Sequence, residues 1–133
     1  MNPFYKYLTE EDKLQEAVIR YAWAVHRLKA IPMNIESNKS QYERFKFKYM
    51  GNYKGILDTF LPYPNSKYNG LFIELKTNDR KVFKKDGTLY ASGKDTHEAQ
   101  VAEIERLNKQ GYYACFAFGF DQAKTIIDNY IKG

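Results

Sequence analysis

Two acidic residues and one lysine lie in short apolar segments of this sequence, where charged side chains are unusual. Asp58 lies within Ile56–Leu61, Glu74 lies within Gly70–Lys76, and Lys76 ends the second segment. If these segments are strands, side chains alternate between the two faces, so Lys76 projects from the same face as Glu74. Ionised groups in apolar strands are costly unless they are paired or bound to a metal ion.

A hairpin that brought Asp58 beside Glu74 would place two carboxylates together, and their repulsion would raise a pKa. A divalent cation removes this conflict, and oxygen-only ligands suit Mg²⁺ or Mn²⁺. The ammonium group of Lys76 could then hold an attacking water and stabilise negative charge that develops on a phosphate. The pattern therefore indicates metal-dependent phosphodiester hydrolysis.

Two other classes of protein remain compatible with these residues. Glu74 and Lys76 alone could form a cross-strand ion pair on a solvated face, in a structural or interaction protein. A nucleic-acid-binding module could also keep such a cluster without being catalytic. Asp58, in a similarly apolar segment at a distance that a hairpin can span, makes the catalytic interpretation of Glu74 and Lys76 as strong as the ion-pair alternative.

Apolar periodicity and turn signals predict the elements that position these residues. A first helix is expected to be capped by Thr9 and to run to about Lys29. The other expected elements are strands at Ile31–Ile35, Ile56–Leu61, Gly70–Lys76 and Tyr112–Phe118, and helices at His97–Gln110 and Asp121–Ile131. The order is roughly α-β-β-β-α-β-α, which predicts an α/β fold with a mixed sheet flanked by helices and a parallel strand pair around the His97 helix.

Two polar segments interrupt this order. Residues 37–54 are expected to form a loop that could contain a helix. Lys85-Asp86-Gly87-Thr88 is a tight-turn signal, and Val82-Phe83 and Leu89-Tyr90 could flank it as a small protruding hairpin.

Length and composition limit the number of domains and the class of partner. With 133 residues the chain is expected to be one domain, residues 1–133. The net charge of +5 favours a polyanionic partner. The best candidates for DNA contacts are basic residues that alternate with aromatic ones, namely Lys39, Arg44, Lys46, Lys48 and Lys54.

Only one cysteine is present, and we find neither a secretory leader nor an apolar run of membrane-spanning length. The expected location is intracellular: cytoplasmic, or the host cytoplasm if the protein is encoded by a phage. The two histidines, His26 and His97, lack the spacing of a zinc site. His97 lies three residues before Gln100 and could face the same site.

Gly55-Ile56-Leu57-Asp58, followed by Gly70-Leu71-Phe72-Ile73-Glu74-Leu75-Lys76, resembles the signature of the PD-(D/E)XK nucleases. More narrowly, the chain resembles the VRR-NUC domain (virus-type replication-repair nuclease). Further matches are the early helix with Glu16, Asn34-x-Glu36, Gln100 in the later helix, Gly111, and the final strand and helix. The resemblance covers nearly the whole chain and implies a restriction-endonuclease-like fold.

The resemblance also implies roles for individual residues. Asp58, Glu74 and the backbone carbonyl of Leu75 would bind the metal ion, with Glu16 reaching it directly or through water. Lys76 would be the catalytic lysine, and Gln100 would help to position Lys76, the water or the DNA. The implied activity is hydrolysis of DNA, on branched or structured substrates in repair, recombination or phage DNA processing, by a possible homodimer.

One feature departs from the family pattern. The family joins the Glu-x-Lys strand to the Gln helix by a short loop, whereas Thr77–Thr96 forms a longer charged connection here. This insert could be a plain surface loop or an arm that contacts DNA or a second subunit.

Overall fold

The computed structural model of the protein describes residues 2–33 and 40–133. The short element η1 (Pro3–Tyr7) is a 3-10 helix, and the strands are β1 (Ile31–Pro32), β2 (Thr59–Leu61), β3 (Leu71–Lys76) and β4 (Tyr113–Phe118). The α-helices are α1 (Glu10–His26), α2 (Gln41–Tyr49), α3 (Lys94–Lys109) and α4 (Phe120–Lys132).

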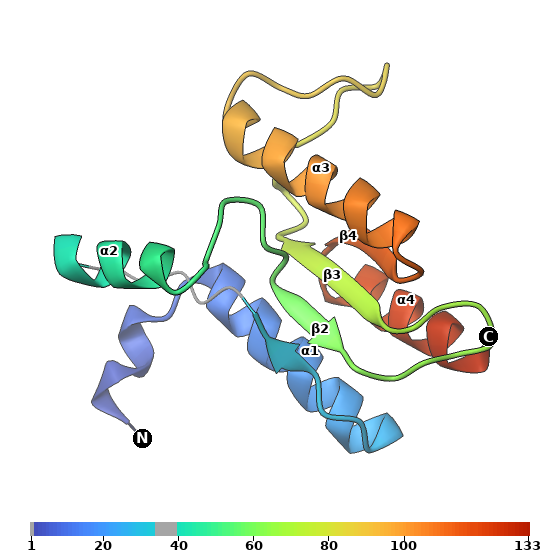
Figure 1. The fold of residues 1–133 in the computed structure, drawn as a ribbon. Coiled ribbons are helices and arrows are strands. Elements are labelled where there is room, and N and C mark those ends of the chain that lie inside the picture. Colours follow the sequence, from blue (N-terminus) through green and yellow to red (C-terminus); the bar gives the residue numbers. More distant parts are fainter. Residues whose placement is uncertain (1, 34–39) are drawn as a thin grey trace.

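The four strands form one mixed sheet in the order β1-β2-β3-β4 (Figure 1). The pairs β1–β2 and β2–β3 are antiparallel, whereas β3 and β4 are parallel and joined through α3. This arrangement confirms the predicted α/β class and the predicted parallel pair. The helices η1 and α2 are additions to the predicted order.

Each face of the sheet is covered by helices, and β3 contributes alternate residues to the two faces. Leu71, Ile73 and Leu75 belong to a core cluster that also contains buried residues of α1 and α4. Phe72 packs on the opposite face against Leu107 of α3. Glu74 and Lys76 alternate with the first set, so both lie on the face that α3 covers.

Helix α1 begins as predicted, with a reciprocal capping box between Thr9 and Asp12. It buries Val18 and Ala22. It ends at His26, three residues before the predicted end, because Arg27 adopts a left-handed conformation with φ of 57°. In the described residues no helix is long and apolar enough to cross a membrane.

Strand β2 is shorter than predicted, and Asp58 lies just before it rather than in mid-strand. Gly55 has a φ of +99°, and a Cβ at this position would lie 2.6 Å from the Ala99 carbonyl oxygen of α3. This sharp turn at the close approach to α3 lies just before residues 56–58, which are not part of β2, although the Asp58 carbonyl accepts a hydrogen bond from the Met33 amide at 2.8 Å. The Asp58 side chain instead accepts a hydrogen bond from the Leu75 amide, which the backbone of a longer β2 would have bonded.

The turn before Gly55 is also tied to α3 by a polar cluster. The Tyr53 hydroxyl donates to Glu103, and Arg106 binds the same carboxylate through Nε and Nη2 at 2.8 and 2.9 Å. Hydrogen bonds from Arg106 hold the pKa of Glu103 below its ordinary value. This cluster fixes the approach of the chain to Asp58.

Helix α2 lies in the segment predicted as a loop that could contain a helix. It begins with a second capping box, between Ser40 and Glu43. None of its residues is buried, and it projects away from the sheet (Figure 1). The predicted strand Ile31–Ile35 is shortened to β1, and residues 34–39, which include Asn34, Glu36 and Lys39 of the sequence predictions, lie outside the described residues.

The insert Thr77–Thr96 contains the predicted hairpin, which protrudes beyond α3 (Figure 1). Phe83 and Leu89 form an antiparallel bridge, and Asp86 accepts hydrogen bonds from the amide and hydroxyl of Thr88. Phe83 packs edge-on against Phe116 of β4. The hairpin is therefore anchored to the sheet at its base.

Candidate active site

Asp58 is joined to β3 by a hydrogen bond from a backbone amide. Leu75 N donates to Asp58 Oδ2 at 2.9 Å. The N–H and C=O of one strand residue point toward the same neighbouring strand, so the Leu75 carbonyl also points to the Asp58 side of β3. The predicted pair of a carboxylate and a backbone carbonyl is thus assembled at one place.

Glu74 and Lys76 form a buried ion pair on the α3 side of the sheet. Their relative exposures are 3% and 7%, and Lys76 Nζ lies 3.4 Å from Glu74 Oε2. The other carboxylate oxygen, Glu74 Oε1, is buried and has no hydrogen-bond partner among the described residues. One acceptor in the pair is therefore left for a further partner.

Electrostatics at Glu74 follow the sequence prediction. Burial raises the pKa of the Glu74 carboxyl, and the neighbouring Asp58 raises it further, while Lys76 only partly offsets these effects. Without a cation, the folded protein thus resists ionising both carboxylates. A positive charge between them would remove this resistance.

The donor set fits a hard divalent cation. Asp58, Glu74 and the Leu75 carbonyl supply only oxygen ligands, and Mg²⁺ needs few protein ligands because it keeps several waters. In residues 2–33 and 40–133, no group of three or more His, Cys, Asp or Glu side chains comes together as a metal site. The candidate ligands are the two carboxylates and the one carbonyl, and no third side chain of these types joins them in this part of the chain.

Gln100 and His97 lie on α3, on the side that faces the sheet. Gln100 is 3% exposed, and its Oε1 has no partner among the described residues. His97 is fully buried, and Lys76 is near enough to lower the pKa of its ring, after the larger effect of burial. The structure thus brings both residues to the α3 face that holds Lys76.

Helix α1 contributes residues that the sequence analysis did not single out. Gln15 Nε2 donates to the backbone oxygen of Asp58 at 3.1 Å. Glu11 lies one turn earlier on the same helix face. Glu16 is instead on the exposed side, where its carboxylate pairs with Arg20 at 3.4 Å. The signal in the sequence was the i,i+4 spacing of Glu11 and Gln15, but Glu11 is also an ordinary charge for the first turn of a helix.

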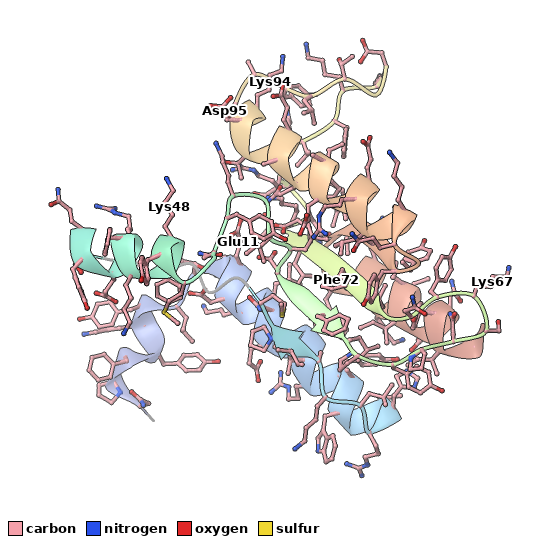
Figure 2. All side chains as sticks on the ribbon, in the orientation of Figure 1. Glu11, Lys48, Lys67, Phe72, Lys94 and Asp95 are labelled. Carbon is pink, nitrogen blue, oxygen red and sulfur yellow. The ribbon has the colours of Figure 1, made fainter. Side chains whose placement is uncertain are left out.

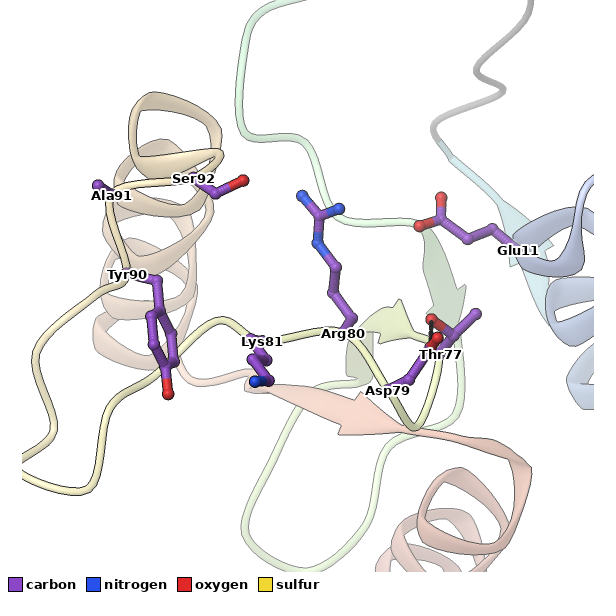
Figure 3. A pocket seen from close by; sticks show the side chains of 8 residues that line it. All are labelled: Glu11, Thr77, Asp79, Arg80, Lys81, Tyr90, Ala91 and Ser92. Carbon is purple, nitrogen blue, oxygen red and sulfur yellow. Dashed lines mark hydrogen bonds between the residues drawn. The ribbon is translucent and has the colours of Figure 1, made fainter.

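A pocket of about 580 Å³ opens beside this cluster, between the start of α1 and the insert (Figure 3). Glu11 points into it from α1, and Thr77, the residue after Lys76, lies at its floor. Arg80 extends into the gap from the insert, between Glu11 and Ser92 (Figure 3). The insert therefore lines a cavity that begins next to the catalytic candidates.

Glu11 and Glu16 make a matched pair of carboxylates on one helix. We expect Glu11→Gln to lower metal-dependent DNA cleavage by about tenfold, because Glu11 faces the pocket, and Glu16→Gln to leave it within about twofold. The measurement is the initial cleavage rate of both variants at saturating Mg²⁺. A larger loss of activity for Glu16→Gln than for Glu11→Gln would support Glu16, the residue predicted from the sequence, and would exclude Glu11.

The basic residues predicted to contact DNA are dispersed over an exposed segment. Arg44, Lys46 and Lys48 are exposed on α2, and Lys48 points outward from the helix (Figure 2). Lys54 is exposed in the turn that leads to Gly55. Lys39 lies outside the described residues.

Comparison with known proteins agrees with this arrangement. No family model matches the sequence, and no curated protein matches it. A solved structure described as "VRR_NUC domain protein" is 26% identical, with a TM-score of 0.63 over 94% of this chain and 90% of that chain. Another, described as "VRR_NUC domain", is 17% identical, with a TM-score of 0.55 over 92% of this chain and 99% of that chain.

The second likeness supports the fold alone, while the first extends over nearly the whole of both chains at higher identity. The resemblance predicted from the order of Asp58, Glu74-x-Lys76 and Gln100 is confirmed at the level of the structure. This chain has the fold of the VRR_NUC domain proteins, a nuclease family.

Proposed function

We propose that this protein is a Mg²⁺- or Mn²⁺-dependent nuclease that hydrolyses phosphodiester bonds of DNA. The observation that carries the proposal is the buried pair of Glu74 and Lys76, with Asp58 beside Glu74. Two carboxylates that resist joint ionisation and one unsatisfied buried acceptor are costly as a structural feature. A cation bound between the two carboxylates would remove this cost.

Each residue has a distinct part in this chemistry. Asp58, Glu74 and the Leu75 carbonyl would hold the cation, which would supply positive charge to the phosphate and lower the pKa of a bound water. Lys76 pairs with Glu74 in this structure, and once that carboxylate bound a cation its ammonium group would orient the attacking water and stabilise the phosphate. We assign Gln100 a part in positioning Lys76 or the water, and Glu16 at most a contribution through water.

The decisive experiment is cleavage of branched, flapped and linear DNA with Mg²⁺ or Mn²⁺, with Ca²⁺ and with EDTA. We expect cleavage with Mg²⁺ or Mn²⁺ and none with EDTA. Cleavage that persists in EDTA, or no cleavage of any of the three substrates with metal present, contradicts the proposal. DNA binding without cleavage would identify a catalytically silent module of the same fold.

The exposed cations of α2 are proposed to bind DNA phosphates. Replacing both Lys46 and Lys48 with Ala is expected to reduce the slope of log Kd against log salt by about 1.5, because each phosphate contact releases counterions. The control is the double variant Lys67→Ala and Lys132→Ala, which changes the net charge equally. Lys67 lies at the end of the molecule away from α2 (Figure 2). An unchanged slope in the first variant excludes these phosphate contacts.

A homodimer is proposed from the aromatic side of α2. Tyr42, Phe45 and Tyr49 share one side of the helix and are 69%, 64% and 82% exposed, and Phe45 stacks on Tyr49. A contiguous apolar patch of this kind is typical of an interaction surface. We expect a dimer mass by light scattering, and a monomer after Phe45→Glu and Tyr49→Glu. A monomeric wild type would contradict the proposed homodimer. The preference for branched DNA would then rest on the cleavage assay alone.

A further inference from the structure

His97 is a buried imidazole whose polar atoms have no partner. Its relative exposure is 0%, and neither Nδ1 nor Nε2 has a hydrogen-bond partner among the described residues. A buried polar atom left unpaired is costly, because the hydrogen bonds that it made to water are lost without replacement. The fold retains this cost at a position one turn from Gln100, which indicates that the ring acquires a partner in another state of the protein.

The position of His97 along the sheet identifies that partner. Gln100, Ile104 and Leu107 follow His97 at helical spacing and complete one stripe of α3. Leu107 and Ile104 pack with Phe72, near the start of β3. Because α3 returns antiparallel to β3, the His97 end of the stripe lies over the Lys76 end of the strand.

Two cations lie close enough to His97 to act on its charge. Lys76 and Arg80 are both near enough to lower the pKa of His97, in addition to the larger effect of burial. Arg80 Nη2 and His97 Cε1 both lie against Gly93, at 2.9 and 3.1 Å from where a Cβ on that glycine would be. The imidazole therefore stays neutral, and one of its nitrogens offers a lone pair to a cationic donor.

Lys76 needs such an acceptor if Glu74 binds a cation. In the present structure Lys76 Nζ has the Glu74 carboxylate as its ion-pair partner. Sharing that carboxylate with a metal ion weakens the pair. A second carboxylate in its place would neutralise the ammonium group, whereas a neutral imidazole can hold it and leave its positive charge available to a phosphate.

We infer that His97 is a positioning residue for Lys76, accepting a hydrogen bond from its ammonium group when Glu74 binds the metal ion. The other ring nitrogen carries the proton and has Gln100 Oε1, another unpaired buried acceptor, one helical turn away. The series Gln100–His97–Lys76 would satisfy three groups at once. This inference rests on the proposed nuclease function.

The first test separates positioning from stability. His97→Leu removes both nitrogens but keeps an apolar side chain in the buried site, so we expect an unchanged or higher unfolding temperature. We expect kcat for DNA cleavage to fall tenfold or more, with KM within twofold. His97→Gln restores a neutral acceptor and should recover at least threefold of that loss. A His97→Leu enzyme with kcat within twofold of wild type overturns the inference.

A double-mutant cycle asks whether His97 acts through Lys76. In a Lys76→Ala background, His97→Leu should change the residual cleavage rate by less than twofold. An equal loss in both backgrounds would mean that His97 contributes independently of Lys76, which overturns the inference. If His97→Leu does not fold, as judged by circular dichroism, His97→Gln enters the same cycle. A wild type that cuts no DNA would instead refute the nuclease function itself.

A third readout needs no cleavage. The chain has two histidines, so the ring nitrogens of His97 can be assigned by NMR with His97→Leu, and His26, bonded to Asp128 at 2.7 Å, serves as the internal control. Adding Mg²⁺ should shift one His97 nitrogen in the direction of a hydrogen-bonded acceptor, and this shift should vanish in Lys76→Ala. A shift that persists without Lys76, or no shift in the wild type, contradicts the inference.

Discussion

Lys76→Ala is expected to lower kcat for Mg²⁺-dependent DNA cleavage by about a thousandfold, with DNA affinity within about threefold. The ammonium group is buried beside the proposed metal ligands and lies on the same strand face as Glu74. In such a low-dielectric site, one charged donor to the developing charge of a phosphate is worth about 3–4 kcal/mol, which corresponds to this factor. Single-turnover cleavage with saturating enzyme measures the effect separately from binding.

The matched control is Lys94→Ala. Lys94 begins α3 and pairs with Glu98 at 3.8 Å on the exposed surface, so the same chemical change is made outside the site. It should cut DNA at the wild-type rate. If Lys76→Ala also cuts within tenfold of wild type, Lys76 is not part of the catalytic machinery, and the buried pair has only a structural function.

The sequence predicted the parts of the fold whose periodicity is strong. β3 and β4 lie within a residue or two of the predicted strands because both are apolar on two faces, as is typical of strands covered by helices on both sides. β2 was predicted too long because residues 56–58 are as apolar as a strand. What shortens it is the close approach of Gly55 to α3, and no local pattern in the sequence reveals that approach.

The sequence predicted α2 only as a loop that could contain a helix, and this has a physical reason. An amphipathic pattern marks a helix by its buried side, and α2 buries none of its residues. The remaining local signal was the Ser40-x-x-Glu43 capping box, which the structure uses at the start of the helix. Propensity and capping alone give a weak prediction when packing does not contribute.

The candidate site was predictable where the backbone periodicity fixed directions. Glu74 and Lys76 share a strand face by simple alternation, whereas the face of α1 that meets Asp58 depends on how the helix docks. Glu16 was assigned from the family resemblance, but Gln15 makes the contact with Asp58. His97 is a similar case, because its complete burial results from the packing of α3 and the insert.

Glu74→Gln is expected to abolish most of the loss of stability that the metal-free protein shows as pH rises from 5 to 8, although Glu74 is central to the proposed site. In the folded state, burial and Asp58 raise the pKa of Glu74 above its ordinary value of 4.5. Below about pH 4.5 both states hold the proton, and the contribution of Glu74 to stability is fully present. As pH rises toward the folded-state pKa, the unfolded chain releases its proton while the folded protein retains it, so stability falls. Gln is of similar shape and does not titrate, so the variant lacks this pH-dependent loss.

Magnesium should offset the loss of stability of the wild type at high pH, because a ligand that binds only the folded state stabilises it. In thermal unfolding between pH 5 and pH 8, the metal-free wild type should lose stability relative to Glu74→Gln as pH rises. Mg²⁺ should raise the unfolding temperature of the wild type, and more so at pH 8 than at pH 5, but not that of the variant. Glu105→Gln, an exposed carboxylate of α3, is the control and should follow the wild type. If wild type and Glu74→Gln have equal pH profiles, or respond equally to Mg²⁺, the Glu74 carboxylate is not a cation ligand. The conflict between Asp58 and Glu74 would then be relieved without a cation.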